Sequence, residues 1–450
     1  MNIFEIFEKI YSFEEETKVY LHEVESDKKE EVLLCKKEKG LFFQIGFSHL
    51  KLLNNQEINF VISHNSFDIK VCHFLDKFAF DSSSKYYLNA YIFKSLGFDE
   101  NQLKYNSYYS KIGNLFFEKL FESNQKFFSI IIDGIVFKIS KYLISPNLKY
   151  SFLCIECDTK IDFKKFKHYV NNIISSIGFL TGKFFKNEEF YFQSEDKNFS
   201  SDVDFFYRSS DKKYSFPRPF TRYPKEWDWK LKDELSEENH NRYSSHIDEN
   251  IFTSLVMLLF SNQRLYFSIR MLFDFYKTPP ISRVPQMFVV LETLCEELNL
   301  KRVKVEKENK QDMGFEILSK IKDKIEIEDL KVLTDIVENI DNKLTNNTVH
   351  FEQTLKNLGI NCKNEEIKIL SKRNDFFHGR IIPNRYQIES EEEFISLELK
   401  YDYYSLRLYV LISKIILKNI GFRGYLINYP KIFESDNGTK LNESCFEKLK

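Results

Sequence analysis

The strongest constraint on the fold is a change in the spacing of apolar residues near the middle of the chain. Up to about residue 211, β-branched and aromatic residues alternate with a period near 2, which indicates strands. From Ser245 onward, apolar residues recur at i, i+3 and i+4, which is typical of helices that bury one face. The sequence therefore predicts an α+β protein: a β-rich domain at 1–211, a connector at 212–244, an all-helical domain at 245–424 and a tail at 425–450.

The first half contains the clearest local patterns. Helical spacing runs from Phe163 to Ile174 after Asp162, a candidate N-cap, and predicts a helix whose last turn reaches Leu180. We find no phosphate-binding glycine loop or nucleophile motif in this half, and expect it to sense a signal or act as a scaffold. Four segments are expected to form strands: 31–47, 58–67, 127–139 and 150–157.

Residues 216–229 form a connector that holds three of the nine prolines and both tryptophans. Proline density of this kind favours an extended chain. Arg218 and Arg222 stand among aromatic residues, and such a mixture could clamp single-stranded RNA by stacking and by pairing with phosphates. The aromatic rings could instead pack onto one or both domains. The two interpretations are compatible.

The second half predicts several helices. An apolar helix at 251–276 ends at two prolines, and the next opens at Pro285, with Glu292 on the border of its buried face. Glu292 could hold Arg373 through an ion pair, or it could be solvated. A capping box at Ser390 and Glu393 opens a long closing helix. Other expected features are a solvated loop at 301–312, helices near 315–325 and 328–344, and loose order at 434–450.

Arginine usage changes along the chain as well. All thirteen arginines lie at Arg208 or later, and the preceding half uses lysine alone. The arginine fork binds phosphate or carboxylate through two parallel hydrogen bonds, which a lysine cannot do. In a lysine-rich chain, the arginines could mark positions that need such binding. Alternatively, the C-terminal half could have a different ancestry.

Bulk properties limit the class of protein. The formal net charge of −2 at pH 7 argues against a surface coated with basic residues, so a nucleic-acid site would be local. The first five residues lack the order of a signal peptide, and no charge-free run of eighteen apolar residues occurs. We therefore expect a cytoplasmic protein without a membrane segment.

The cysteines do not suggest a disulfide framework. There are seven, an odd number, and they are scattered along the chain. Cys154 and Cys157 have metal-like spacing with His168 nearby, but there is no second pair, and residues three apart in a strand face opposite sides. Reduced core cysteines are the favoured interpretation, and we expect no metal and no cofactor. His240, His246 and His350 are expected at the surface.

The candidate site is Arg373-Asn374-Asp375-Phe376-Phe377-His378-Gly379-Arg380, at the end of a helical pattern that begins near Glu366. Histidine takes or gives a proton near neutral pH, and arginine grips phosphate oxygens. Helix geometry places Asn374 one turn before His378, where it can orient the ring. Phe376 and Phe377 are expected to anchor the segment in the core. Without further context, His378 would most simply cap the carbonyls at the helix end.

These residues resemble the R-N-x-x-x-H signature of HEPN-domain ribonucleases, and the flanking sequence resembles the ApeA-like HEPN proteins of bacterial anti-phage defence. The resemblance covers residues 245–424, including the helices at 251–276, 289–294 and 391–420, and extends faintly to 150–192. It implies an all-helical HEPN domain that dimerises and cleaves RNA without a metal. Arg373 and His378 match the catalytic pair, and Asn374 matches the polar position beside the arginine.

The resemblance and the arginine pattern together suggest further roles and partners. Glu292 and Asp375 are supporting candidates, and Arg380, Arg218 and Arg222 are candidates for RNA contact. The expected activity is an endoribonuclease acting in abortive infection, with 2′-hydroxyl attack on the phosphodiester and transfer RNA as one possible substrate. The expected partners are RNA, a second copy of the chain and a phage-derived trigger. The rival hypothesis is a non-catalytic HEPN-like sensor or adaptor that binds RNA or protein.

Overall fold

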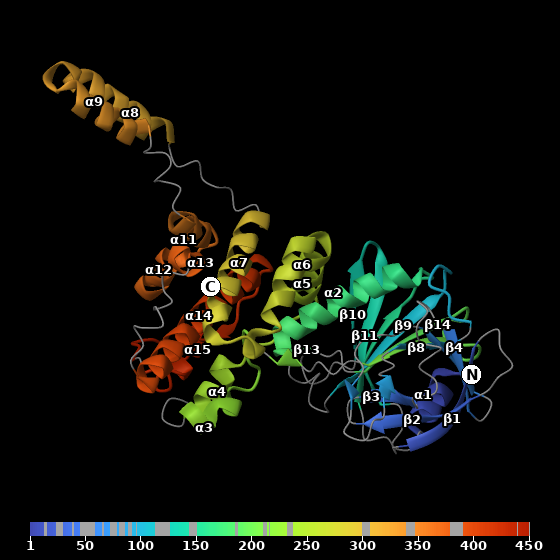
Figure 1. Cartoon of the computed structure of the whole chain (residues 1–450). Coiled ribbons are helices and arrows are strands. Elements are labelled where there is room, and N and C mark those ends of the chain that lie inside the picture. Colours follow the sequence, from blue (N-terminus) through green and yellow to red (C-terminus); the bar gives the residue numbers. More distant parts are fainter. Residues whose placement is uncertain are drawn as a thin grey trace. The chain divides into compact units, whose positions relative to one another are not determined.

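The computed structural model forms two compact units (Figure 1). The sheet unit contains Met1–Arg218 and His246–Ser261, and the helical unit contains Pro219–Ser245 and Asn262–Lys450. The structure describes residues 1–12, 16–23, 30–37, 40–45, 59–64, 67–72, 79–80, 86–88, 92–95, 97–112, 127–143, 151–184, 188–209, 214–215, 217–231, 237–298, 307–338, 347–378, 390–438 and 440–449.

The sheet unit is built on an antiparallel sheet, which has fourteen strands among the described residues. Their order is β10-β11-β12-β9-β14-β15-β8-β5-β4-β1-β2-β3-β7-β6. The strands are β1 (Glu16–Glu23), β2 (Glu30–Lys37), β3 (Gly40–Ile45), β4 (Asn59–His64), β5 (Phe67–Cys72), β6 (Ala79–Phe80), β7 (Tyr86–Leu88), β8 (Ile92–Ser95), β9 (Tyr105–Ile112), β10 (Phe127–Ile132), β11 (Ile135–Leu143), β12 (Ser151–Cys157), β14 (Glu188–Ser194) and β15 (Asp204–Ser209). A separate pair joins β13 (Lys183–Phe184) to β16 (Tyr214–Ser215).

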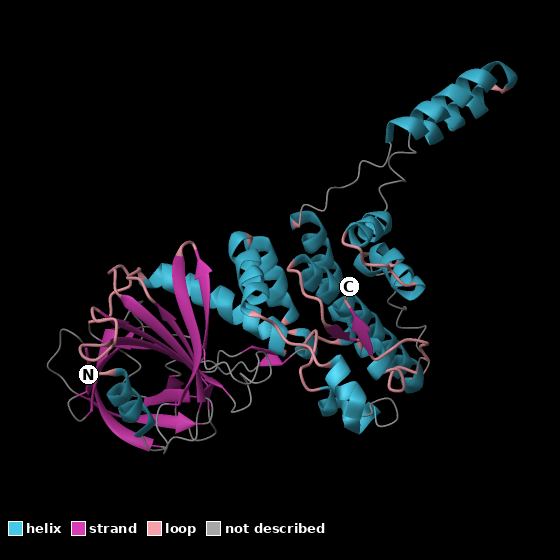
Figure 2. Ribbon diagram, turned by 180° about the vertical axis from the view of Figure 1, so that it is seen from behind, coloured by secondary structure: helices cyan, strands magenta, loops and turns pink. Residues whose placement is uncertain are grey.

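Aromatic residues form the core on both faces of this sheet. On one face lies α1 (Ile3–Ser12), around which the sheet curves (Figure 2), and Phe7 of α1 meets the Tyr109 ring of β9 at 5.5 Å. On the other face lies α2 (Phe163–Thr181), whose Phe166 ring is 6.3 Å from the ring of Tyr191. Tyr191 in turn is 4.9 Å from Tyr108. Tyr108 and Tyr109 face opposite layers because side chains alternate along a strand.

The predicted helix at 163–180 is confirmed. It spans Phe163–Thr181, and the Asp162 side chain accepts a hydrogen bond from the Lys165 N–H at 2.8 Å, as an N-cap does. Strands also occupy much of the four predicted segments, although the first and third are each split into hairpins, β2–β3 and β10–β11. The turn between β10 and β11 explains one split, since Asp133 and Gly134 both have positive φ.

The helix predicted at 251–276 is wrong as a single element. The structure has α5 (Glu249–Ser261) and α6 (Gln263–Leu272), separated at Asn262. Asn262 is extended, and its side chain accepts a hydrogen bond from the Leu265 N–H at 3.1 Å, which starts a new helix. The predicted helical domain at 245–424 also differs at this point, because α5 belongs to the sheet unit. There Phe252 lies 5.1 Å from Phe128 of β10.

The helical unit is centred on the packing of α14 against α7. The predicted N-terminal cap of α14 (Glu391–Asn419) is present: the Ser390 hydroxyl accepts a hydrogen bond from the Glu393 N–H at 3.2 Å. Short turns occupy Pro224–Trp227, Phe275–Lys277 and Lys322–Lys324. The α-helices are α3 (Asp228–Leu231), α4 (Glu237–Tyr243), α6, α7 (Pro280–Glu297), α8 (Lys307–Ile321), α9 (Ile327–Glu338), α11 (Asn347–Asn357), α12 (Asn364–Ser371), α13 (Arg373–Phe377), α14 (Glu391–Asn419) and α15 (Tyr429–Ile432).

The end of the chain is ordered where loose order was predicted. Strand β17 (Tyr425–Ile427) pairs with β18 (Phe446–Lys448), and Cys445, Phe446 and Leu449 are buried. Burial of these apolar side chains offsets the entropy cost of ordering the segment. The solvated loop predicted at 301–312 is wrong from Lys307 onward, where α8 begins, and residues 301–306 lie outside the described part.

The part of the connector from Pro224 to Leu231 is helical rather than extended. Pro224 opens a helical turn that continues into α3, which suits proline because the first turn of a helix needs no N–H partner. Its rings pack within the helical unit: Phe220 stacks on Phe422 at 5.1 Å, and Trp227 lies 5.9 Å from Tyr429. The packing interpretation therefore holds for these two residues.

The observed class is mixed, with an N-terminal antiparallel sheet region and a helical C-terminal region, as predicted at that level. Between residues 245 and 424, the described chain contains helices and no strand. Within the described ranges, we find no helix whose length and hydropathy would let it cross a bilayer.

Candidate functional site

The R-N-x-x-x-H segment lies at a helix break in the helical unit. The predicted continuous helix divides at Lys372 into α12 and α13, and α13 contains only Arg373–Phe377. His378 follows as the C-terminal cap, and its backbone N–H donates to the Asn374 carbonyl at 3.0 Å. The prediction that His378 ends a helix is therefore confirmed. Gly379 and Arg380 lie outside the described residues.

Arg373 is held by a carboxylate on a neighbouring helix. Its Nε donates to Oε1 of Glu292 on α7, and both side chains are partly exposed, at 24% and 26%. Of the two uses considered for Glu292, the structure shows the ion pair. Partial exposure means that solvent screens this pair, so its main effect is to orient the guanidinium rather than to stabilise the fold.

Asn374 connects the arginine to the histidine. Its side-chain Oδ1 accepts a hydrogen bond from Nη1 of Arg373 at 2.8 Å, while its backbone carbonyl accepts from the N–H of His378. The prediction that the Asn374 side chain orients the His378 ring is not what the structure shows. The amide instead orients the guanidinium, because Arg373 is its neighbour and the His378 side chain is exposed.

The two phenylalanines of the motif have different surroundings. Phe376 is buried, with ring centroids 5.8 Å from Tyr401 and 6.0 Å from Phe288. Phe377 is 40% exposed, and the Arg373 guanidinium lies 4.6 Å from its ring centroid. The prediction that both anchor the segment is right for Phe376 and wrong for Phe377. Consecutive residues of a helix point about 100° apart, so Phe376 faces the core and Phe377 faces solvent.

The structure brings two further residues to the start of the motif. Nζ of Lys372 donates to the Tyr404 hydroxyl at 3.2 Å and lies over the same ring, 5.4 Å from its centroid. Tyr404 lies on α14, and Lys372 immediately precedes the motif. The two consecutive cations at the start of α13 are therefore held by different helices, Lys372 by α14 and Arg373 by α7. The Lys372-Arg373 pair was visible in the sequence, but the role of Tyr404 was not.

The remaining candidates lie elsewhere or stay untested. Asp375 is half-buried on α13, and its supporting role remains a prediction. The Arg222 guanidinium is 5.7 Å from the Tyr223 ring in the helical unit. Arg218 is the last residue of the sheet unit's first segment. Nothing in these positions tests the proposed RNA contacts. His246 is exposed and His240 is half-buried, whereas the side chain of His350 is not described.

The cysteine pair of β12 is part of the core. Cys154 and Cys157 are buried and carry free thiols. Burial raises the pKa of the Cys157 thiol to about 11 and the pKa of Cys154 further, so both are protonated near neutral pH. Within the described residues, no group of three or more His, Cys, Asp or Glu side chains is arranged to hold a metal.

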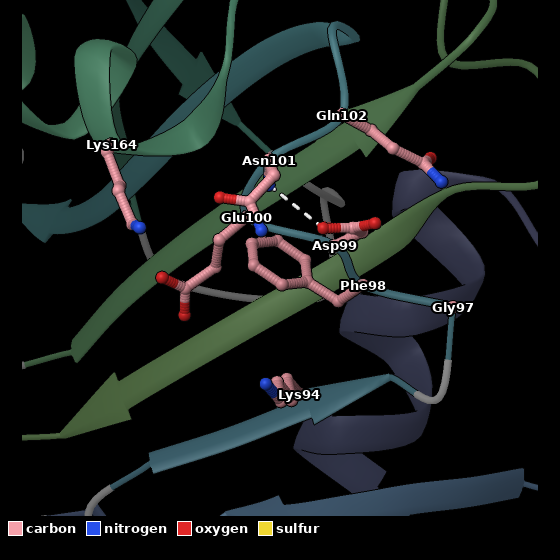
Figure 3. Close-up of a pocket in the computed structure, with 8 residues that line it drawn as sticks. All are labelled: Lys94, Gly97, Phe98, Asp99, Glu100, Asn101, Gln102 and Lys164. Atoms are coloured by element: carbon pink, nitrogen blue, oxygen red, sulfur yellow. Dashed lines mark hydrogen bonds between the residues drawn. The ribbon is translucent and has the colours of Figure 1, made fainter.

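A hollow of about 480 Å³ lies in the sheet unit beside the loop at 97–102 (Figure 3). Asp99 and Glu100 line it with Lys94 and Lys164, so its charges are mixed. The lining contains no histidine, cysteine or serine. Asp204 links the two ends of this loop, because it accepts hydrogen bonds from the Ser95 hydroxyl and from Nζ of Lys104, each at 2.9 Å. We assign no chemistry to this hollow.

A second charged cluster lies in the helical unit, and three of its members, Arg407, Lys414 and Glu366, are almost fully buried. Arg407 donates through both Nη atoms to Glu443, at 2.8 and 2.7 Å, and its side chain is 1% exposed. Lys414 and Glu366, 1% and 0% exposed, pair at 3.2 Å in the same unit. Lys363 donates to Glu443 at 2.9 Å and to Glu447 at 3.0 Å. These pairs join α12 and α14 to the C-terminal segment.

Comparisons with known proteins give no assignment. No protein-family model matches the chain, and no curated protein or solved structure matches it. The function must therefore be inferred from the residues and their geometry.

Proposed function

We propose that the helical unit is a metal-independent endoribonuclease of the HEPN type, with Arg373 and His378 as its catalytic pair. One observation supports this most directly: the guanidinium of Arg373 is held from two sides, by Glu292 and Asn374, next to a partly exposed rim that ends in the exposed side chain of His378. An oriented guanidinium and an accessible imidazole are the two groups that the proposed phosphodiester cleavage uses.

The proposed chemistry is attack by the 2′-hydroxyl on the adjacent phosphorus. The O2′–P bond forms and the P–O5′ bond breaks, leaving a 2′,3′-cyclic phosphate and a 5′-hydroxyl. His378 takes the proton from the 2′-hydroxyl or gives one to the departing oxygen. Arg373 stabilises the negative charge that grows on the phosphoryl oxygens in the transition state. Glu292 and Asn374 position the guanidinium.

The proposed enzyme acts as a dimer. Cleavage of this kind uses one general acid and one general base, and a single motif supplies one histidine. A two-fold pair of chains brings two copies of His378 to one cleft, because an isologous interface presents the same residues from both sides. The single-stranded part of a structured RNA, such as a transfer RNA loop, suits a site that reads unstacked bases.

We also propose that the activity serves bacterial anti-phage defence in the cytoplasm, on the basis of the resemblance in sequence. A toxic nuclease must be held inactive until infection, and the sheet unit is the candidate for recognising a phage-derived trigger. Such control requires an inactive and an active state of the protein, and the trigger must bind the active state more tightly.

The test is made in cells and on the purified protein. Wild type and His378→Ala are expressed, challenged with a panel of phages, and RNA ends are sequenced. We expect phage restriction and new cyclic-phosphate ends with the wild type only. EDTA should leave the ribonuclease activity of the wild type intact, and replacing the substrate's 2′-hydroxyl with hydrogen should abolish it. Equal protection by both proteins without new ends would instead favour a non-catalytic sensor or adaptor, and metal dependence would exclude this mechanism.

A further inference from the structure

The exposed aromatic ring of Phe377 lies beside the candidate catalytic residues. Its side chain belongs to the last residue of α13, directly before His378, and is 40% exposed. Isolated exposed aromatic residues are common on protein surfaces and need no special role. Phe377 differs from these because its ring is packed against the arginine proposed to bind phosphate.

The ring is held in place from the protein side. The Arg373 guanidinium lies 4.6 Å from its centroid, and the ring of Phe288 on α7 lies 6.4 Å away with an interplanar angle of 54°. Arg373 is itself held by Glu292 and Asn374. A supported ring loses little conformational freedom when a ligand binds, which favours tight contact with a flat partner.

Nucleobases are such flat partners. Single-stranded RNA is recognised by stacking its unpaired bases on aromatic rings and guanidinium planes, while cations pair with its phosphates. Phe377 and Arg373 supply both kinds of contact within one short helix. A phosphate bound at Arg373 would bring the base of an adjoining nucleotide to the exposed part of the Phe377 ring.

We infer that Phe377 is a base-stacking residue for single-stranded RNA, which binds the nucleotide adjoining the scissile phosphate and makes recognition depend on the presence of a base rather than on its identity. The inference rests on the proposed function and adds a substrate contact to it. Every base has a π-face, so stacking tolerates different sequences.

The experiment measures binding separately from cleavage. His378→Ala protein is titrated with a short single-stranded oligoribonucleotide containing 2-aminopurine, whose fluorescence falls when it stacks. The same titration uses Phe377→Ala, Phe377→Leu and Phe377→Trp in the His378→Ala background. Phe315→Ala is the matched control, because Phe315 is 39% exposed and lies on α8.

We expect Phe377→Ala and Phe377→Leu to lose the fluorescence change and to weaken binding about tenfold, as removal of one stacking contact does. Phe377→Trp should retain both, and Phe315→Ala should match its parent. With His378 intact, replacing the nucleotide next to the cleaved bond by an abasic one should lower kcat/KM about tenfold for the wild type. The same replacement should not change kcat/KM for the Phe377→Ala variant. The leucine variant keeps apolar bulk without a π-face, which separates stacking from general packing.

Two results would overturn the inference. One is equal RNA affinity and equal quenching in all Phe377 variants. The other is a change of oligomeric mass in Phe377→Ala with RNA binding unchanged, which would place the ring in a protein interface. Failure of the ribonuclease proposal gives a different pattern: RNA binds with Phe377-dependent quenching, but the wild type makes no cyclic-phosphate ends.

Discussion

Two arginine–glutamate pairs of the helical unit have the same chemistry and opposite surroundings. Arg407 and Glu443 are 1% and 13% exposed, and the carboxylate accepts hydrogen bonds from Arg407, Lys363 and Asn428. Arg373 and Glu292 are 24% and 26% exposed, and the exposed Phe377 ring lies 4.6 Å from the Arg373 guanidinium. The first pair is enclosed by protein, and the second faces solvent.

Burial gives these two similar ion pairs different roles, one in stability and the other in orienting an arginine. A buried ion pair need not stabilise the fold relative to apolar residues, but removing one partner leaves an uncompensated charge in a medium of low polarity. A partly exposed pair contributes little to stability, and can orient an arginine toward a ligand at small cost. We therefore expect the buried cluster around Glu443 to affect mainly stability, and the Arg373–Glu292 pair to affect mainly activity.

The largest expected effect is on stability, from Arg407→Ala. This change leaves the mostly buried Glu443 carboxylate with Lys363 and Asn428 as its remaining partners and should lower the free energy of unfolding by about 3 kcal/mol. Arg264→Ala is the control, because its pair with Glu296 is exposed at 60% and 47%, and should cost about 1 kcal/mol or less. Urea unfolding of both variants measures the difference, and similar losses in the two would remove the distinction between the clusters.

The next effect is the pH dependence of stability through Glu443. Burial opposes ionisation, but hydrogen bonds from Arg407, Asn428 and Lys363 outweigh it and lower the pKa of Glu443 from 4.5 to about 2. A lowered carboxyl pKa stabilises the folded state above pH 4.5, and this contribution is lost as the pH falls toward 2. It amounts to at most about 3 kcal/mol.

Comparison of wild type with Glu443→Gln checks this dependence. The difference in unfolding free energy should be largest near pH 7 and shrink as the pH falls from 4.5 toward 2, since wild-type Glu443 becomes protonated. A difference that does not change with pH would mean that the charge of Glu443 is not what stabilises the segment.

A smaller effect, on activity, is expected from Glu292→Gln. The amide can still accept a hydrogen bond from Arg373 but carries no charge, so kcat/KM for RNA should fall about tenfold. The free energy of unfolding should change by less than about 1 kcal/mol. Glu296→Gln on the same helix is the control and should keep full activity. Loss of stability without loss of activity in Glu292→Gln would reverse the roles assigned to the two pairs.

The smallest effect is expected from Tyr404→Phe. It removes the hydroxyl that accepts from Lys372 and keeps the ring, which is 6.0 Å from Phe376. The loss of one partly exposed hydrogen bond should cost about 0.5–1 kcal/mol of stability and change cleavage by ~2-fold or less. A thermal melt and an RNA cleavage assay measure both, and a large loss of cleavage would add Tyr404 or Lys372 to the site.

Local structure was predictable where near neighbours decide it. The helix after Asp162, the capping box at Ser390 and the position of His378 at a helix end all depend on residues within one or two turns. The division of the apolar helix at Asn262 was missed. Its apolar period continues across the break, and the cap formed by one asparagine is a weak signal within a strongly apolar run.

The candidate site was predictable in part for the same reason. The motif residues are neighbours in sequence, so their placement on one short helix follows from the pattern. The exposure of Phe377 and the link between Asn374 and Arg373 do not follow from it. Both depend on which side of α13 faces α7. The helix break at Lys372 changes that orientation relative to a continuous helix.

Local spacing was enough to predict the strand-rich first region, the helical second region, the caps at Asp162 and Ser390, and the position of His378 at a helix end. It failed for the start of α7, which begins at Pro280 with the predicted Pro285 inside it. Only the tertiary structure decided that α5 joins the sheet unit, that Glu292 reaches Arg373 across 81 residues, and that Arg407, Glu443 and the chain end form a buried cluster. These features arise from the relative orientation of distant helices. Orientation depends on how side chains fill a core, which no local period encodes.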